Sequence, residues 1–92
     1  MKKVCRDSNR LIDLPNIGKS IAADLQAIGI ERPQQLCRQN PLSLYEKINQ
    51  AHGCRQDPCV LDVLMAAVNF MEGGPARPWW TFTAERKRKY HI

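Results

Sequence analysis

Residues 14–25 read LPNIGKSIAADL, and this stretch decides the fold that we expect. Pro15 and Asn16 interrupt any helix that arrives from the N-terminal side, because proline disfavours the helical conformation in the residue before it and asparagine tolerates a positive φ. Gly18 then frees the backbone for a second helix, in which apolar side chains recur with a helical period. The stretch therefore predicts a tight hairpin between two helices.

The second helix of this hairpin begins with amides that have no intrahelical partner. The N–H groups of Lys19, Ser20 and Ile21 precede the first helical hydrogen bond, and the helix dipole places positive charge at the same end. Lys19 adds a full charge beside them. Such a helix end is suited to a phosphate group. The residues that we expect at this phosphate site are Asn16, Ile17, Gly18, Lys19 and Ser20. The alternative is that the hairpin is only a tight turn of a helical domain.

The letters Gly18-Lys19-Ser20 also end the nucleotide-binding P-loop motif, which requires a glycine at position 13. Position 13 is Asp13, and no hydrophobic strand precedes it. A carboxylate at this point would repel a triphosphate, so we exclude nucleotide hydrolysis.

The order of residues in the hairpin resembles the helix-hairpin-helix motif of DNA-binding and DNA-repair proteins. The resemblance rests on Leu14-Pro15, Ile17-Gly18, Ala22 and Leu25. In that family two glycines flank an apolar residue, and the hairpin amides hold one phosphate of a DNA strand without reading its sequence. Here Asn16 stands where the first glycine is usual. The resemblance implies sequence-independent DNA binding, and because such units also serve as protein contacts, a protein-interaction adaptor is the alternative.

The whole chain is similar to a small bacterial family of uncharacterised helix-hairpin-helix proteins, the pathogenicity-locus family. The similarity runs from residue 11 to residue 89. Besides the hairpin, its marks are Gly29-Ile30 with Pro33 and Leu36, the run from Asp57 to Asp62, and Pro78-Trp79-Trp80 followed by Thr83 and Glu85-Arg86-Lys87. The resemblance implies a fold and a DNA association, and it brings no reaction, cofactor or small-molecule substrate.

The size of the chain, 92 residues, predicts one compact all-α bundle of about five short helices. We expect residues 1–76 to form the helix-hairpin-helix domain. The expected helices cover residues 8–13, 19–29, 31–38, 41–52 and 58–72. The last of these is apolar over most of its girth, which predicts that it lies in the middle of the bundle.

The ends of these helices carry recognisable signals. Asp7 or Ser8 is the expected cap of the first helix, with Leu11 and Ile12 turned inward. Asn40 and Asp57, each followed by a proline, predict the starts of two later helices. The expected inner face of the helix over 41–52 consists of Leu44, Tyr45, Ile48 and Ala51.

Residues 77–92 are expected to form an aromatic and basic extended strap that packs on the same domain. The segment over 78–83 is rich in residues that favour extended structure. Trp79 and Trp80 either stack on unpaired bases or complete the core, and we favour the core because the chain has few aromatic residues. The basic residues Arg86, Lys87, Arg88 and Lys89 are either a solvated helical extension or phosphate contacts.

Composition narrows the functional class further. Residues 85–92 contain four Lys and Arg residues and one acid, Glu85, so this segment carries +3 of the total net charge of +5. A basic segment of this kind favours weak, salt-sensitive contact with nucleic acid. A membrane span needs about 20 apolar residues, and no segment of the sequence has such a run. No apolar run follows the N-terminal lysines, so we expect no signal peptide. We therefore expect a cytoplasmic protein. The sequence does not combine a general base, a nucleophile and an orienting group. The chain is also too short for the cleft in which a glycosylase holds a flipped base, so we expect no catalysis.

Four cysteines, at positions 5, 37, 54 and 59, lack the paired spacing of zinc ribbons. The nearest group to a metal cluster is His52 with Cys54 and Cys59. We expect reduced structural thiols and no bound metal, with metal or disulfide roles as the alternative.

Overall fold

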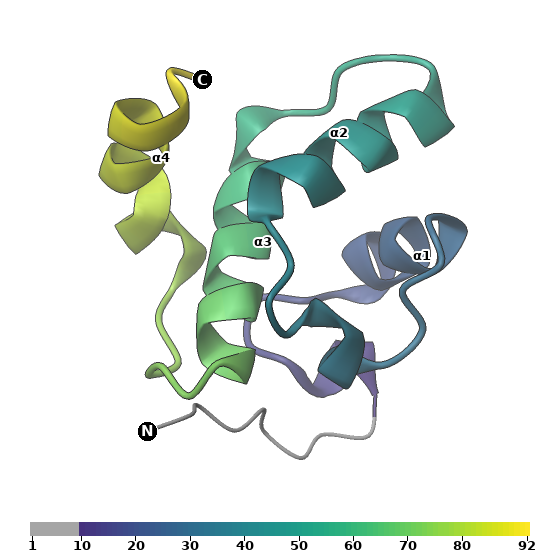
Figure 1. Ribbon diagram of the computed structural model, residues 1–92, viewed down its shortest axis with the longest axis horizontal. Coiled ribbons are helices and arrows are strands. Elements are labelled where there is room, and N and C mark those ends of the chain that lie inside the picture. The colour runs from purple at the N-terminus through teal and green to yellow at the C-terminus, as the bar shows by residue number, and fades with distance from the viewer. Residues whose placement is uncertain (1–9) are drawn as a thin grey trace.

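The structure, a computed structural model, describes residues 10–92 and is all-helical in this range (Figure 1). Its four α-helices and three 3-10 helices follow in the order η1 (Leu11–Asp13), α1 (Lys19–Ala27), η2 (Pro33–Leu36), α2 (Pro41–His52), α3 (Pro58–Met71), η3 (Trp79–Phe82) and α4 (Thr83–Tyr90). The all-α prediction is confirmed.

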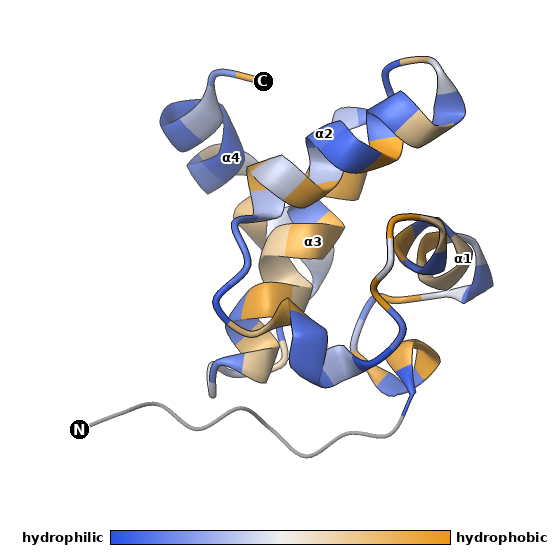
Figure 2. Cartoon of the chain, turned by 45° about the vertical axis from the view of Figure 1, so that its right-hand side comes forward, coloured by the Kyte–Doolittle hydropathy of each residue, from blue (hydrophilic) through white to orange (hydrophobic). Residues whose placement is uncertain are grey.

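The central element is α3, which lies between α4 on one side and α1 with α2 on the other (Figure 1). Residues 61–68 of α3 are all buried, so the helix meets neighbours around its whole girth. Figure 2 shows apolar residues along α3 and a mostly hydrophilic α4. This confirms the expectation that the longest apolar helix forms the middle of the bundle.

Helix ends follow local signals in the sequence. The Asn40 side chain accepts hydrogen bonds from the amides of Leu42 at 2.8 Å and Ser43 at 3.4 Å, and it caps α2. Beyond the other end of α2, Gly53 has a φ of 74°, a left-handed conformation that glycine adopts without strain. Asp57 caps α3 in the same way that Asn40 caps α2.

The first arm of the hairpin differs from the expected helix. It is a single 3-10 turn, η1, while the proposed caps at positions 7 and 8 lie outside the described residues. Leu11 is buried, but Ile12 is 39% exposed, so its expected inward position is wrong. A helical period of 3.6 does not apply to one 3-10 turn, in which fewer side chains share a face. Ala51 of α2, also expected on an inner face, is exposed.

The C-terminal segment is helical, so the extended strap predicted for it is wrong. After a bend at Pro78, η3 runs directly into α4, because Thr83 at their junction has helical φ and ψ of −58° and −47°. Trp79 packs against the core and Phe82 is 3% exposed. Burial of Phe82 and packing of Trp79 overcome the extended preference of residues 78–83, whereas the Ala, Glu, Arg and Lys residues of α4 favour a helix by themselves.

An ion pair buried between α3 and α4 holds the C-terminal helix in place. Asp62 is fully buried and its Oδ1 lies 3.3 Å from Nε of Arg86, whose side chain is also buried. The Thr83 hydroxyl donates a hydrogen bond of 2.7 Å to the other carboxylate oxygen of Asp62. The charges of Asp62 and Arg86 are both removed from water, so loss of either side chain would leave the other charge buried without a partner and destabilise the packing.

Candidate nucleic-acid interface

The hairpin begins with a type II turn over residues 14–17. The amide of Ile17 donates to the Leu14 carbonyl at 3.2 Å, Pro15 takes the first central position, and Asn16 takes the second with a φ of 69°. This turn type requires a positive φ at its second central residue and favours proline at the first. Leu14 and Ile17 are both buried, so they anchor the turn to the core.

The N-terminus of α1 follows the turn and is open to solvent. Gly18 is its N-cap, and the first helical bond runs from the Ala22 amide to the Gly18 carbonyl at 3.0 Å. The amides of Lys19 and Ser20 precede this bond, and both residues are exposed. A Cβ placed on Gly18 would meet no atom within 4 Å. The backbone is thus approachable at the point where amides and dipole favour an anion.

Asn16, expected at the phosphate, has its side chain committed elsewhere. Its Nδ2 donates a 2.7 Å hydrogen bond to the carbonyl of Arg77, 61 residues away in the chain. The hairpin turn is therefore tied to the segment that leads into η3. Ile17 is buried and can offer only its backbone.

Arg77, which sequence reasoning missed, contacts the hairpin through its backbone carbonyl, while its guanidinium lies against η3. Its guanidinium carbon lies 4.0 Å from the centre of the Phe82 ring, and its side chain donates to the hydroxyl and carbonyl of Thr81 at 3.2 and 3.1 Å. These contacts position the guanidinium. Nothing local marks residue 77, because its proximity to Asn16 depends on tertiary packing.

The expected basic cluster of α4 does not act as one surface. Arg86 is buried against Asp62, which removes it from any solvent-facing interface. Lys89 lies 5.5 Å from the centre of the Tyr90 ring. Lys87 and Arg88 are exposed. Since α4 and α1 flank opposite sides of α3, the structure does not bring these cations together with Lys19 (Figure 1).

A groove of about 350 Å³ lies between the two arms of the hairpin. Exposed Ile12 contributes to its apolar lining, and charged residues of both signs stand around it. Its full lining consists of Arg10, Leu11, Ile12, Lys19, Ala22, Ala23, Gln26 and Glu31. Arg10 lies 3.2 Å from Asp13, an exposed ion pair that stabilises little.

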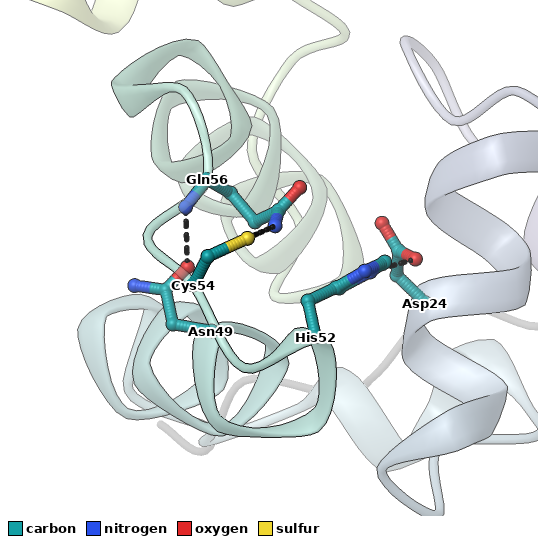
Figure 3. Close-up of polar contacts among 5 residues, drawn as sticks. All are labelled: Asp24, Asn49, His52, Cys54 and Gln56. Carbon is teal, nitrogen blue, oxygen red and sulfur yellow. Dashed lines mark hydrogen bonds and ion pairs between the residues drawn. The ribbon is translucent and has the colours of Figure 1, made fainter.

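A polar cluster joins the end of α2 to α1 and contains His52 (Figure 3). The ring of His52 lies 2.7 Å from a carboxylate oxygen of Asp24, while Cys54 turns toward the side chain of Gln56 (Figure 3). The Asn49 side chain accepts a 2.8 Å bond from the Gln56 amide. His52 and Cys54 thus have different partners. Within residues 10–92, no three His, Cys, Asp or Glu side chains gather in a way that could hold a metal ion.

The cysteines occupy different environments. Cys54 and Cys59 are free thiols. A side-chain hydrogen bond with the Asp57 carboxylate, assisted by burial, raises the pKa of the Cys59 thiol. Cys37 is disulfide-bonded, so the expectation of reduced thiols is wrong at this position.

The described fold and site define a small all-helical protein in which an exposed helix N-terminus presents backbone amides beside a lysine. The chain belongs to the Pathogenicity locus family, whose model matches residues 5–88. It is also similar to the mitomycin resistance protein McrB of Streptomyces lavendulae, with 49% identity over 82 residues that cover 89% of this chain and 78% of the relative. No solved structure matches. In the part of the chain that the structure describes, no helix is long and apolar enough to cross a membrane.

Proposed function

We propose that this protein is a DNA-associated module that binds the phosphate backbone, without sequence preference, through a helix-hairpin-helix formed by η1, the turn over 14–18 and α1. The observation that carries the proposal is the open N-terminus of α1. Its first-turn amides, the helix dipole and exposed Lys19 all favour an anion at the same point. We place the protein in the cytoplasm and assign it no catalytic role.

The charges support weak binding that depends on salt. One lysine and a few amides hold one or two phosphates, and the net charge of +5 attracts the strand at longer range. Exposed Lys87 and Arg88 add to this attraction from α4. With one or two phosphate contacts at the hairpin, the affinity for duplex DNA should fall with a log-log salt slope of about −1 to −2.

Titration of a fluorescent DNA duplex at several salt concentrations tests the proposal. We expect wild-type protein to bind sequences of different composition equally well. Lys19→Ala should weaken binding and reduce the magnitude of the salt slope by about one, because one phosphate contact is lost. Lys47→Ala, which removes an exposed lysine from α2, is the matched control and should change the affinity much less.

Gly18→Val tests whether the backbone itself is the binding group. Gly18 has a φ of −97° and open space at its Cβ, so valine should fit without strain and block the approach of a phosphate. We expect lower DNA affinity and only a small loss of stability, because valine is a poorer N-cap residue than glycine. Ala27→Val, at the other end of α1, is the control for added bulk. Wild-type affinity in both Gly18→Val and Lys19→Ala would contradict the hairpin site.

A protein-interaction adaptor is the second candidate function, and the groove between η1 and α1 favours it. Ile12 is one of two large apolar side chains that stand exposed among the described residues. An apolar lining with charged residues around it resembles a peptide-binding surface more than a phosphate site. The name of the relative refers to mitomycin resistance and does not say whether that protein binds DNA or another protein. Absence of DNA binding at low salt would favour the adaptor.

A further inference from the structure

The continuous helix formed by η3 and α4 has two faces of different character. Its inner face carries Trp79, Phe82, Arg86 and Tyr90, which are buried or partly buried against the bundle. Its outer face carries Trp80, Ala84, Lys87 and Arg88, all exposed. The spacing of four and then three residues from Trp80 to Ala84 and Lys87 keeps these side chains on one side of the helix. An indole and two cations thus lie along one exposed surface.

Trp80 is the most exposed large apolar side chain among residues 10–92, at 61%. It makes no contribution to the core that would explain its position, since Trp79 occupies that place. The two indoles meet edge to face, with ring centres 5.7 Å apart and planes at 85°. This contact holds the Trp80 ring in a defined orientation, while its exposure leaves at least one face open. An indole held in this way is preorganised for stacking.

Among residues 10–92, neither cationic side chain of this face takes part in a hydrogen bond or an ion pair. Arg86 is buried and Lys89 lies beside the Tyr90 ring, whereas Lys87 and Arg88 project into solvent. Glu85, the one acid of α4, lines a different hollow between α3 and α4. The outer face therefore combines an aromatic platform with positive charge and no carboxylate of its own helix. Proteins that bind single strands use this combination, because every base has a face to stack on and every nucleotide carries a phosphate.

We propose that the outer face of η3 and α4 binds a single-stranded segment of nucleic acid, with an unpaired base stacked on Trp80 and phosphates held by Lys87 and Arg88. The inference rests on the proposed function and specifies it further, since it adds a second contact surface that requires unpaired bases. The target would then be DNA in which single-stranded and duplex regions adjoin. The hairpin would meet the backbone on one side of α3, and α4 would meet the unpaired segment on the other.

Fluorescence titration of the full-length protein with a short oligothymidylate tests the stacking. Trp79→Phe leaves Trp80 as the one indole of the chain, and its emission should be quenched when the oligonucleotide binds. Trp80→Phe leaves Trp79, whose emission should change little. If Trp79→Phe does not fold, the comparison of wild type with Trp80→Phe still reports the quenching of Trp80.

Affinity measurements with three substitutions at position 80 separate stacking from apolar contact. Trp80→Ala should weaken single-strand binding by about 5- to 150-fold. Trp80→Leu should lose most of the affinity as well, whereas Trp80→Phe should keep most of it because a ring face remains. Lys87→Ala and Arg88→Ala should each reduce the magnitude of the single-strand salt slope by about 0.7. Lys47→Ala on α2 is the control for loss of a charge elsewhere.

Three results would overturn the inference. Trp80→Ala could bind the oligonucleotide as wild type does, in which case Trp80 is not a stacking platform. It could dissociate a dimer of the DNA-free protein without changing DNA affinity, which would make this face a protein contact. The protein could also bind no nucleic acid of either form, and then the proposed function fails too. Duplex binding that depends on Lys19, together with an inert Trp80, would leave the proposed function intact and reject only the inference.

Discussion

At the scale of single residues, Asn16 shows how one residue both shapes the hairpin turn and joins it to a distant segment of the chain. Its left-handed backbone completes the type II turn, and its amide reaches the carbonyl of Arg77. A phosphate on the α1 amides would therefore meet Gly18 and Lys19, with the Asn16 side chain held at Arg77. The asparagine in place of a glycine is explained by this bond, which a glycine could not make.

Substitution of Asn16 separates its two contributions to stability. Asn16→Gly removes the hydrogen bond but suits the left-handed conformation, so we expect destabilisation of at most about 1 kcal/mol. Asn16→Ala removes the bond and adds backbone strain, and the free energy of unfolding should fall by about 2 kcal/mol. Urea unfolding followed by circular dichroism measures both. Equal stability of the alanine and glycine variants would contradict the strain argument.

Asp57 provides a pH-dependent contribution at the start of α3. Its Oδ1 accepts a 2.8 Å hydrogen bond from the Cys59 amide, and this bond holds the pKa of Asp57 below its ordinary value. A lowered folded-state pKa means that the carboxylate stabilises the fold above the unfolded pKa, which is about 3.9, and loses this effect as pH falls through the folded value.

Thermal melts across pH test this cap. Asp57→Ala should have a lower melting temperature than wild type at pH 7, and the difference should shrink as the pH falls below about 4. Asn40→Ala, which removes the cap of α2, is the control, because its cap carries no titrating group and its deficit should not follow the same pH course. A difference for Asp57→Ala that stayed constant down to pH 2 would argue against a charged cap.

At the scale of elements, α4 is joined to α3 by the buried contact between Asp62 and Arg86. Asp62→Ala would leave the Arg86 guanidinium buried without its carboxylate, and we expect the free energy of unfolding to fall by about 3–5 kcal/mol. The double variant Asp62→Leu with Arg86→Met removes both charges and should regain most of that loss. Urea unfolding measures both variants. A single variant as stable as wild type would show that the ion pair does not hold α4 in place.

The same interface explains which elements could be predicted from sequence. The starts of α2 and α3 depend on a cap followed by a proline, which is a local signal, and both were predicted correctly. Residues 83–90 are good helix formers, and a helical extension is one of the two interpretations of Arg86 to Lys89. The turn over Trp79–Phe82 depends instead on burial of Phe82, and no local pattern carries this information. The residues over 78–83 favour extended structure and therefore predict a strap, and tertiary packing overrides that preference.

At the scale of the whole molecule, the candidate site divides into a predictable and an unpredictable part. The open N-terminus of α1 follows from the order Pro15, Asn16, Gly18, because each residue has a restricted or permissive backbone. The bond between Asn16 and the Arg77 carbonyl, and the separation of Trp79 from Trp80 into inner and outer side chains, depend on how η3 and α4 dock. The sequence predicts Arg86 to Lys89 as one basic cluster. The packed structure shows that Arg86 is buried, whereas Lys87 and Arg88 are exposed.

The bond between Asn16 and Arg77 also bears on how the protein is made. The chain leaves the ribosome from its N-terminus, and 61 residues must follow Asn16 before its acceptor has been synthesised. At ordinary rates of synthesis this takes about 3 to 12 seconds. Until then the turn lacks the contact that fixes its asparagine, and α3 lacks the helix that covers one of its sides. The nascent chain therefore spends this interval with a hairpin that lacks its contact to Arg77.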